Sequence, residues 1–231
     1  MMRSQELERA PLQPRLGTHL AEVVSVKDTT GRGRVQIRLY DHDNVGKQDA
    51  PIWARVAVPF AGSKMGAFFI PGKGDEVLVS FLNGDPRLPI VVGGLWNGNA
   101  KQSETLGGAG DQVDRWTLTG KNGTRIAIVE EQAGAVIKLS TPQGITMTMT
   151  DQSGGKVEIK QGGTTITSDS QGVTVKTSGK IAMTGSQMNV TAGQVSFTAA
   201  KVSCSSILQA VTVQASTVIS GVYTTGAGNV L

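Results

Sequence analysis

The last part of this chain is a long run without proline, rich in Val, Ile, Thr and Ser. Pro142 is the last proline of the 231-residue chain, so 89 residues follow without one. Because proline cannot donate a hydrogen bond to a sheet ladder, such a run is typical of continuous β-sheet. Short alternating apolar pairs recur along it. The leading residues of these pairs are Val173, Ile181, Met188, Val195 and Val202, so the first spacing is eight residues and the next three are seven. Repeats of this length indicate stacked strands.

Each of these repeats offers too few apolar side chains for one chain to enclose a core. One turn of a monomeric β-helix needs roughly 18 or more residues, at about 3.3 Å each. Three chains wound about one axis avoid this problem, because each contributes one face to a narrow prism. Small interior side chains fit that prism, and after Trp116 the only aromatic residues are Phe197 and Tyr223. The sequence therefore predicts an intertwined trimeric β-helix, or β-prism, with an ordinary β-sandwich as the alternative.

The first hundred residues show a different pattern of short strands. Val35, Ile37 and Leu39 alternate with polar residues, and five such segments occur with no helical period between them. This predicts an all-β fold that begins with a five-stranded barrel of the OB type. The predicted strands are residues 19–26, 35–40, 52–59, 75–81 and 89–96. The predicted domains are an N-terminal arm (1–16), an OB domain (17–98), a Gly-rich linker (99–114) and a needle (115–231) with its tip at about 220–231.

The charge distribution separates the two halves of the chain. Lys and Arg balance Asp and Glu before residue 115, so the net charge of +4 comes from the second half, and no side chain after Lys201 is charged. No apolar run is long enough to span a membrane, and the N-terminus lacks the apolar core of a secretory signal. We therefore expect synthesis in the cytoplasm. The lone Cys204 is expected to be buried, as free cysteines usually are.

The chain offers no constellation typical of an enzyme, so we expect a non-enzyme without cofactors. Its two histidines are His19 and His42, and no second His or Cys cluster completes a metal site around Asp41-His42-Asp43. Glu130 and Glu131 are interpreted as exposed edge charges. A β-helical tailspike enzyme acting on surface polysaccharide is an alternative from a different class. Nucleic-acid binding is not expected, because residues 1–114 carry no net charge.

Several blocks between Trp53 and Gly98 resemble a known family. WARV, AGSKMGAFFIP, GDEVLVSFLNGDP and PIVVGGLWNG are similar in order and spacing to the OB domain of phage baseplate assembly protein V and of VgrG spikes. The resemblance implies a homotrimeric central spike that caps the tail tube or hub of a contractile injection machine. On sheath contraction such a spike pierces the outer membrane of the target cell. The needle's uncharged end suits that task, because charged groups are costly in hydrocarbon.

The resemblance also implies partners and a location. VgrG proteins usually carry a hub domain ahead of the barrel, whereas 16 residues precede it here, so we expect a separate baseplate hub protein at the OB end. That favours a phage tail, tailocin or phage-like particle, with the chain in the virion baseplate. A VgrG-like spike of a secretion system is the alternative.

The tip departs from the pattern of the family's short spikes, which end in an iron ion held by His-x-His pairs. No histidine follows His42, so no such iron site is expected. The tip either closes on its own apolar residues or ends in open strand edges, which recruit a partner. We favour a small PAAR-type cap on those edges. The residues expected at this contact are Val222, Tyr223, Val230 and Leu231.

Overall fold

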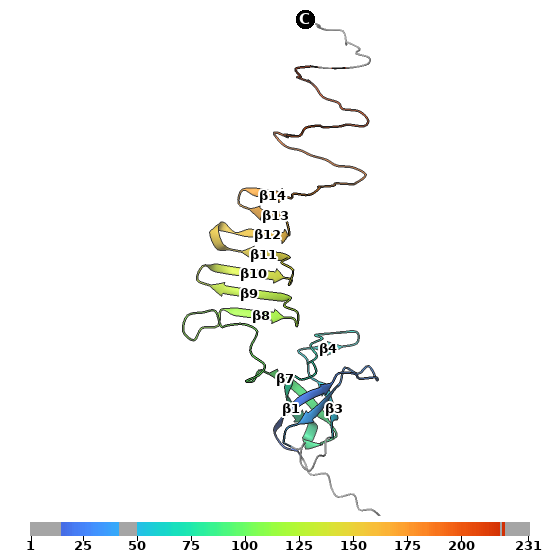
Figure 1. Ribbon diagram of the computed structural model, residues 1–231, viewed down its shortest axis with the longest axis vertical. Helices are drawn as coiled ribbons and strands as arrows, with labels where there is room; N and C mark the ends of the chain where they lie inside the picture. Colours follow the sequence, from blue (N-terminus) through green and yellow to red (C-terminus); the bar gives the residue numbers. More distant parts are fainter. Residues whose placement is uncertain (1–14, 42–49, 218, 220–231) are drawn as a thin grey trace, which may run out of the picture. The chain divides into compact units, whose positions relative to one another are not determined.

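The computed structural model describes residues 15–41, 50–217 and 219. The described residues form β-strands and two 3-10 turns, Leu82–Gly84 (η1) and Gln152–Gly154 (η2) (Figure 1). None of the described helices is long and apolar enough to cross a membrane. The chain divides into two units at Lys180, and each is described by itself.

Five strands of the first unit close into a barrel. They are β1 (Thr18–Ser25), β2 (Val35–Leu39), β3 (Ile52–Val56), β6 (Glu76–Phe81) and β7 (Pro89–Leu95). The order around the barrel is β1-β2-β3-β7-β6, with β6 returning to β1. All neighbours are antiparallel except β3 and β7, which run parallel. The all-β class and the five-stranded OB-type barrel predicted from the sequence are therefore confirmed.

Alternating apolar side chains fill the barrel. Val35, Ile37 and Leu39 of β2 point inward, and so do Val77, Val79 and Phe81 of β6. The remaining buried members of this core are Ala21, Val23, Ala54 and Val91. Since successive side chains of a strand point to opposite faces, the period of two seen in the sequence places one complete set of residues inside.

A small hairpin that the sequence did not predict lies between β3 and β6. Its strands are β4 (Ala61–Gly62) and β5 (Met65–Gly66), and Lys64 in its turn has a positive φ of 58°. The segment around this hairpin leaves large apolar side chains exposed, among them Met65, Phe68 and Phe69.

The second sheet of the first unit is an antiparallel meander in which every strand pairs with the next one (Figure 1). Its seven strands are β8 (Arg115–Thr119), β9 (Arg125–Glu131), β10 (Gly134–Ser140), β11 (Thr146–Thr150), β12 (Lys156–Gln161), β13 (Thr164–Asp169) and β14 (Gly172–Lys176). Its outer strands β8 and β14 each have one sheet neighbour among the described residues.

The pairing within this sheet corrects one expectation. A β-prism that begins at residue 115 would move each strand to a new face, whereas β8–β14 pair within one chain. Tight turns explain the difference: Gly123 and Gly144 adopt positive φ of 86° and 83°, which closes the β8–β9 and β10–β11 hairpins. Closing such short loops costs little entropy. The trimeric β-helix stays a prediction.

The second unit differs from the first in its backbone hydrogen bonding. Its described residues, 181–217 and 219, contain no strand, and no ladder pairs them with other described residues. Figure 1 draws this unit as extended stretches joined by bends. Extended backbone without a partner strand has its N–H and C=O groups open to water or to another chain.

Candidate functional site

One face of the β8–β14 sheet is largely apolar, and its polar members are Glu130, Gln161, Thr164 and Ser168. The registers align Trp116 with Ile128, Ile128 with Ile137, and Ile137 with Met149 across successive strands. The same face continues through Val157 and Ile159 to β13 and β14. We call this the apolar face; its side chains are Trp116, Leu118, Ile126, Ile128, Ile137, Leu139, Met147, Met149, Val157, Ile159, Ile166, Val173 and Val175.

The apolar face is uncovered in the single chain. Its side chains are exposed by between 38% (Met149) and 74% (Val173). Within the described part of this sheet, Ala127 is the one fully buried apolar residue, and its register with Lys138 places it on the other face. An apolar surface of this extent marks an interaction site, since monomeric soluble proteins rarely leave one contiguous and open.

The opposite face of the same sheet is mostly polar, and its apolar members are Ala127, Val129 and Val136. Thr148, Glu158 and Thr167 lie side by side across β11, β12 and β13. Lys160 and Lys156 lie 2.8 Å and 3.3 Å from the carboxylate oxygens of Glu158. The hydrogen bond from Lys160, followed by that from Lys156, lowers the pKa of Glu158 below its ordinary value despite the desolvation. The sheet therefore has one face suited to water and one suited to a partner.

A cluster of ion pairs connects Glu104, in the segment before β8, to arginines of the sheet. Arg115 Nη2 lies 2.6 Å from Glu131 Oε1, and Arg115 Nη1 lies 3.4 Å from Glu104 Oε1. Arg125 Nη2 donates to the other oxygen of Glu104, and this bond is the main reason why the pKa of Glu104 is lowered. Glu130 is exposed as predicted, whereas Glu131 is half-buried and paired with Arg115 because the register sets β8 beside it.

The residues predicted for the tip contact, Val222, Tyr223, Val230 and Leu231, lie outside the described residues. Cys204 is described, and in the single chain it is exposed, with its thiol 3.4 Å from the carbonyl oxygen of Ile207. Its predicted burial is therefore wrong for the single chain, because no ladder or second layer covers this segment within the chain.

The two histidines are placed differently by the structure. His19 Nδ1 lies 2.7 Å from Asp41 Oδ2, and its ring meets Phe81 edge-on at 5.3 Å between centroids. His42 falls outside the described residues. In the part of the chain that is described, no group of three or more His, Cys, Asp or Glu side chains is placed to hold a metal ion.

A second candidate site lies on the barrel, and sequence reasoning missed it. A groove of about 420 Å³ opens between the β1–β2 loop, β3 and the β6–β7 loop. We call it the arginine groove; its lining residues are Arg32, Arg34, Trp53, Arg55, Leu82, Arg87, Leu88, Pro89 and Ile90. The zero net charge of residues 1–114 hides this cluster, because its arginines come from three separate segments.

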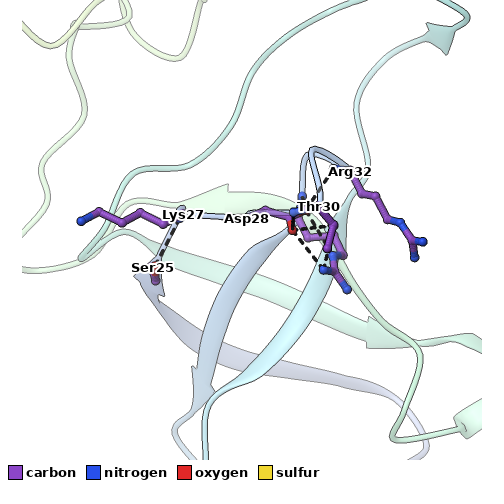
Figure 2. Close-up of polar contacts among 6 residues, drawn as sticks. Ser25, Lys27, Asp28, Thr30 and Arg32 are labelled. Carbon is purple, nitrogen blue, oxygen red and sulfur yellow. Dashed lines mark hydrogen bonds and ion pairs between the residues drawn. The ribbon is translucent and has the colours of Figure 1, made fainter.

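Asp28 organises the β1–β2 loop at one side of the groove. Its side chain is only 5% exposed, and its carboxylate accepts hydrogen bonds from the backbone N–H groups of Thr30, Arg32 and Arg34 at 3.0–3.2 Å. The Arg34 guanidinium also donates to both carboxylate oxygens. These bonds, led by that of Arg34, hold the pKa of Asp28 far below its ordinary value. Figure 2 shows the loop folded around this carboxylate, with the Arg32 side chain directed away from it.

The β6–β7 loop repeats this arrangement on the other side of the groove. Arg87 Nη2 lies 2.6 Å from Asp85 Oδ2, and the bonds from Arg87 lower the pKa of Asp85 to about 2. Between the loops, the Arg34 guanidinium lies over the Trp53 ring, 5.3 Å from its centroid. The groove is therefore lined by arginines, of which Arg34 and Arg87 already have carboxylate partners.

Comparison with known families matches the barrel. Residues 19–96 match the family described as the type VI secretion system/phage-baseplate injector OB domain. The match begins within β1 and ends one residue after β7, so it covers all five barrel strands.

The individual relatives include type VI spike proteins and a toxin. The chain is 32% identical over 123 residues to the type VI secretion system spike protein VgrG1a of Pseudomonas aeruginosa. This alignment covers 51% of this chain and 19% of that protein. It is 45% identical over 62 residues to the spike protein VgrG3 of Vibrio cholerae, covering 26% of this chain and 6% of that protein. It is also 40% identical over 75 residues to the actin cross-linking toxin VgrG1 of Vibrio cholerae, covering 32% of this chain and 7% of that protein. The chain thus spans less than a fifth of the length of these relatives.

Proposed function

Since residues 19–96 form an OB domain of the type VI secretion and phage-baseplate injector family, we propose that the chain is the central spike of a contractile injection machine. The observation that carries this proposal is the apolar face of β8–β14, which follows the injector barrel along the chain. An exposed apolar face of this size marks an interaction site, and in this proposal other copies of the chain cover it. The role is structural.

The proposed assembly is a homotrimer. Three copies that turn their apolar faces to one axis bury the side chains that a single chain leaves 38–74% exposed. Fully burying one Val, Ile or Met is worth roughly 1.5–3 kcal/mol, so the repeated gain along seven strands supports association. Three chains also give the unpaired segment 181–217 strand partners, in the form of the predicted β-prism.

The proposed action is to pierce the outer membrane of the target cell when the sheath contracts. No side chain beyond Lys201 carries a charge, which supports this role because charged groups are costly in hydrocarbon. The contact with the membrane is transient. The matched family description includes both secretion systems and phage baseplates, so a phage tail, a phage-like particle and a VgrG-like secretion spike all fit the proposal.

The proposed domain plan is an arm (1–16), a barrel (17–98), a linker (99–114) and a needle (115–231). A baseplate hub protein binds at the barrel end. A PAAR-like cap covers the needle tip through Val222, Tyr223, Val230 and Leu231, and no bound iron, other cofactor or nucleic acid is part of the proposal. The spike belongs to the particle and is made in the bacterial cytoplasm.

A localisation experiment in the native particles tests this role. The gene is replaced by an epitope-tagged copy, the contractile particles are purified, and the tag is located by immunogold electron microscopy. We expect label at the baseplate end of the tube, and we expect particles from a strain without the gene to lose killing or delivery. Label along the sheath, or full activity without the gene, contradicts the proposal.

A further inference from the structure

We propose that the arginine groove of the barrel is a docking site for an acidic polypeptide segment of a partner, with Arg32 and Arg55 binding its carboxylates. This inference concerns the barrel alone and stands apart from the spike role, since it does not depend on the apolar face or on trimer formation. Four arginines and one tryptophan line this single groove.

The position of the groove on the fold supports a binding role. OB barrels bind their ligands on the face of the second and third strands, between the loops that join strands one to two and four to five. In this barrel those loops are residues 26–34 and 82–88, and the third strand is β3. The lining residues Arg32, Arg55 and Arg87 come from those three segments.

Two of the four arginines are available for a ligand. Arg34 is engaged with Asp28, and Arg87 with Asp85. Arg32 and Arg55 are exposed, and among the described residues neither guanidinium has an ion pair or hydrogen bond. The groove therefore presents two unused guanidinium groups, each of which can bind a carboxylate through two parallel hydrogen bonds.

The Asp28 network holds one of these arginines in place before any ligand arrives. Asp28 accepts from the Arg32 backbone N–H at 3.1 Å, so the backbone of Arg32 is fixed while its side chain extends outward (Figure 2). Because the loop backbone is already ordered, binding has to order only the Arg32 side chain, which favours a specific site over a diffuse positive surface.

The tryptophan distinguishes between two anionic ligands. Single-stranded nucleic acids bind OB grooves by stacking bases on free aromatic faces. Trp53 is the one aromatic residue that lines this groove, and the Arg34 guanidinium already lies over its ring. The groove thus offers guanidinium groups that can bind carboxylates through two hydrogen bonds, but no aromatic ring that is free to stack on a base. This favours the carboxylates of an acidic segment over a nucleic acid.

The test uses the full-length protein and fluorescence anisotropy with three labelled probes, namely oligoglutamate, oligoglutamine and oligothymidylate of equal length. We expect oligoglutamate to bind and to bind more weakly as salt increases, and we expect oligoglutamine not to bind. In the double variant Arg32→Ala/Arg55→Ala, the affinity for oligoglutamate falls about tenfold or more, because two charge-assisted pairs are lost.

The matched control is Lys27→Ala/Lys73→Ala, which removes the same charge from exposed barrel positions outside the groove. Lys27 points away from Arg32 (Figure 2). We expect this control to change the affinity by less than about twofold, as for a rim charge. Circular dichroism checks that both variants are folded.

Three results overturn the proposal. The first is a wild-type protein that does not bind oligoglutamate. The second is an equal loss in both double variants, which indicates unspecific attraction. The third is tighter binding of oligothymidylate that depends on Arg32 and Arg55, which assigns the groove to nucleic acid. None of these results bears on the localisation of the protein in particles.

Discussion

Asp28 makes polar contacts with three residues of the β1–β2 loop. Its nearly buried carboxylate satisfies three backbone N–H groups and the Arg34 guanidinium. Such a carboxylate has to be ionised, because a neutral acid accepts these bonds poorly and leaves the arginine without its counter-charge. The loop conformation beside the arginine groove therefore depends on the charge of one side chain.

The Asp28→Asn variant tests this dependence. The pKa of Asp28 is lowered in the folded protein, so its stabilisation is present above the ordinary value of 3.8 and is lost as pH falls below it. We expect the variant to unfold several degrees lower at neutral pH and to lose less stability on acidification than the wild type does. Barrel unfolding, followed by tryptophan fluorescence from neutral to acidic pH, measures both effects. Asp111→Asn serves as the control, because Asp111 is exposed and has no hydrogen bond or ion pair with described residues.

At the scale of secondary-structure elements, the two faces of β11 define the interaction surface. Met149 and Thr148 are sequence neighbours whose side chains lie on opposite faces, the former beside Ile137 and the latter beside Lys138. The same alternation runs through the sheet. A substitution therefore has different consequences according to the face that it alters.

We expect Met149→Asp to dissociate the assembly and Thr148→Asp to leave it intact. Loss of the apolar side chain removes roughly 1.5–3 kcal/mol per chain, and an unpaired carboxylate inside the shared core costs more. Thr148 faces the polar side, where an added charge stays in water. Analytical ultracentrifugation of both variants at the same concentration reads out the difference. Equal behaviour of the two variants would falsify the assignment of the apolar face.

The segment 181–213 carries a second prediction at this scale. It has no ladder with the described residues of the chain, and we expect its amide hydrogens to be bonded to neighbouring copies in the proposed trimer. Hydrogen–deuterium exchange followed by mass spectrometry is expected to show slow exchange in this segment and fast exchange in residues 101–103, which are exposed and serve as the internal reference. Exchange as fast as in the reference means that no interchain ladder forms.

Strand positions could be predicted from the sequence because they depend on a local pattern, the alternation of apolar and polar residues. Alternation at Val35, Ile37 and Leu39 identifies β2, whereas of the five repeat residues only Val173 lies on the apolar face. The Asn122-Gly123 dipeptide, which favours a tight turn, lies between β8 and β9, whereas the seven-residue repeat begins only near Val173. The pairing of β8–β14 was missed because the β-prism was predicted from residue 115 onward.

The arginine groove could not be predicted by any local rule. Arg32, Arg55 and Arg87 are separated by more than twenty residues each, and only the closure of the barrel brings them together. The net charge is a sum over the whole half-chain, so the positive charge of such a cluster is offset in that sum by carboxylates elsewhere in the sequence. The ion pair of Glu131 with Arg115 was hidden in the same way, because it depends on strand register.

At the scale of the whole molecule, the chain combines a self-sufficient barrel with parts that are incomplete alone. The barrel has its own buried core. The β8–β14 sheet exposes an apolar face, and the described residues of 181–217 make no strand. In the proposed trimer, neighbouring copies cover the apolar face and provide strand partners for residues 181–217.

The native mass of the purified full-length protein tests that claim most directly. Light scattering coupled to size-exclusion chromatography, at micromolar concentration in native buffer, is expected to give three times the chain mass of 24.1 kDa. The trimer should also resist SDS until it is heated, because many ladder bonds and apolar contacts open together. A folded, soluble monomer of 24.1 kDa contradicts the account.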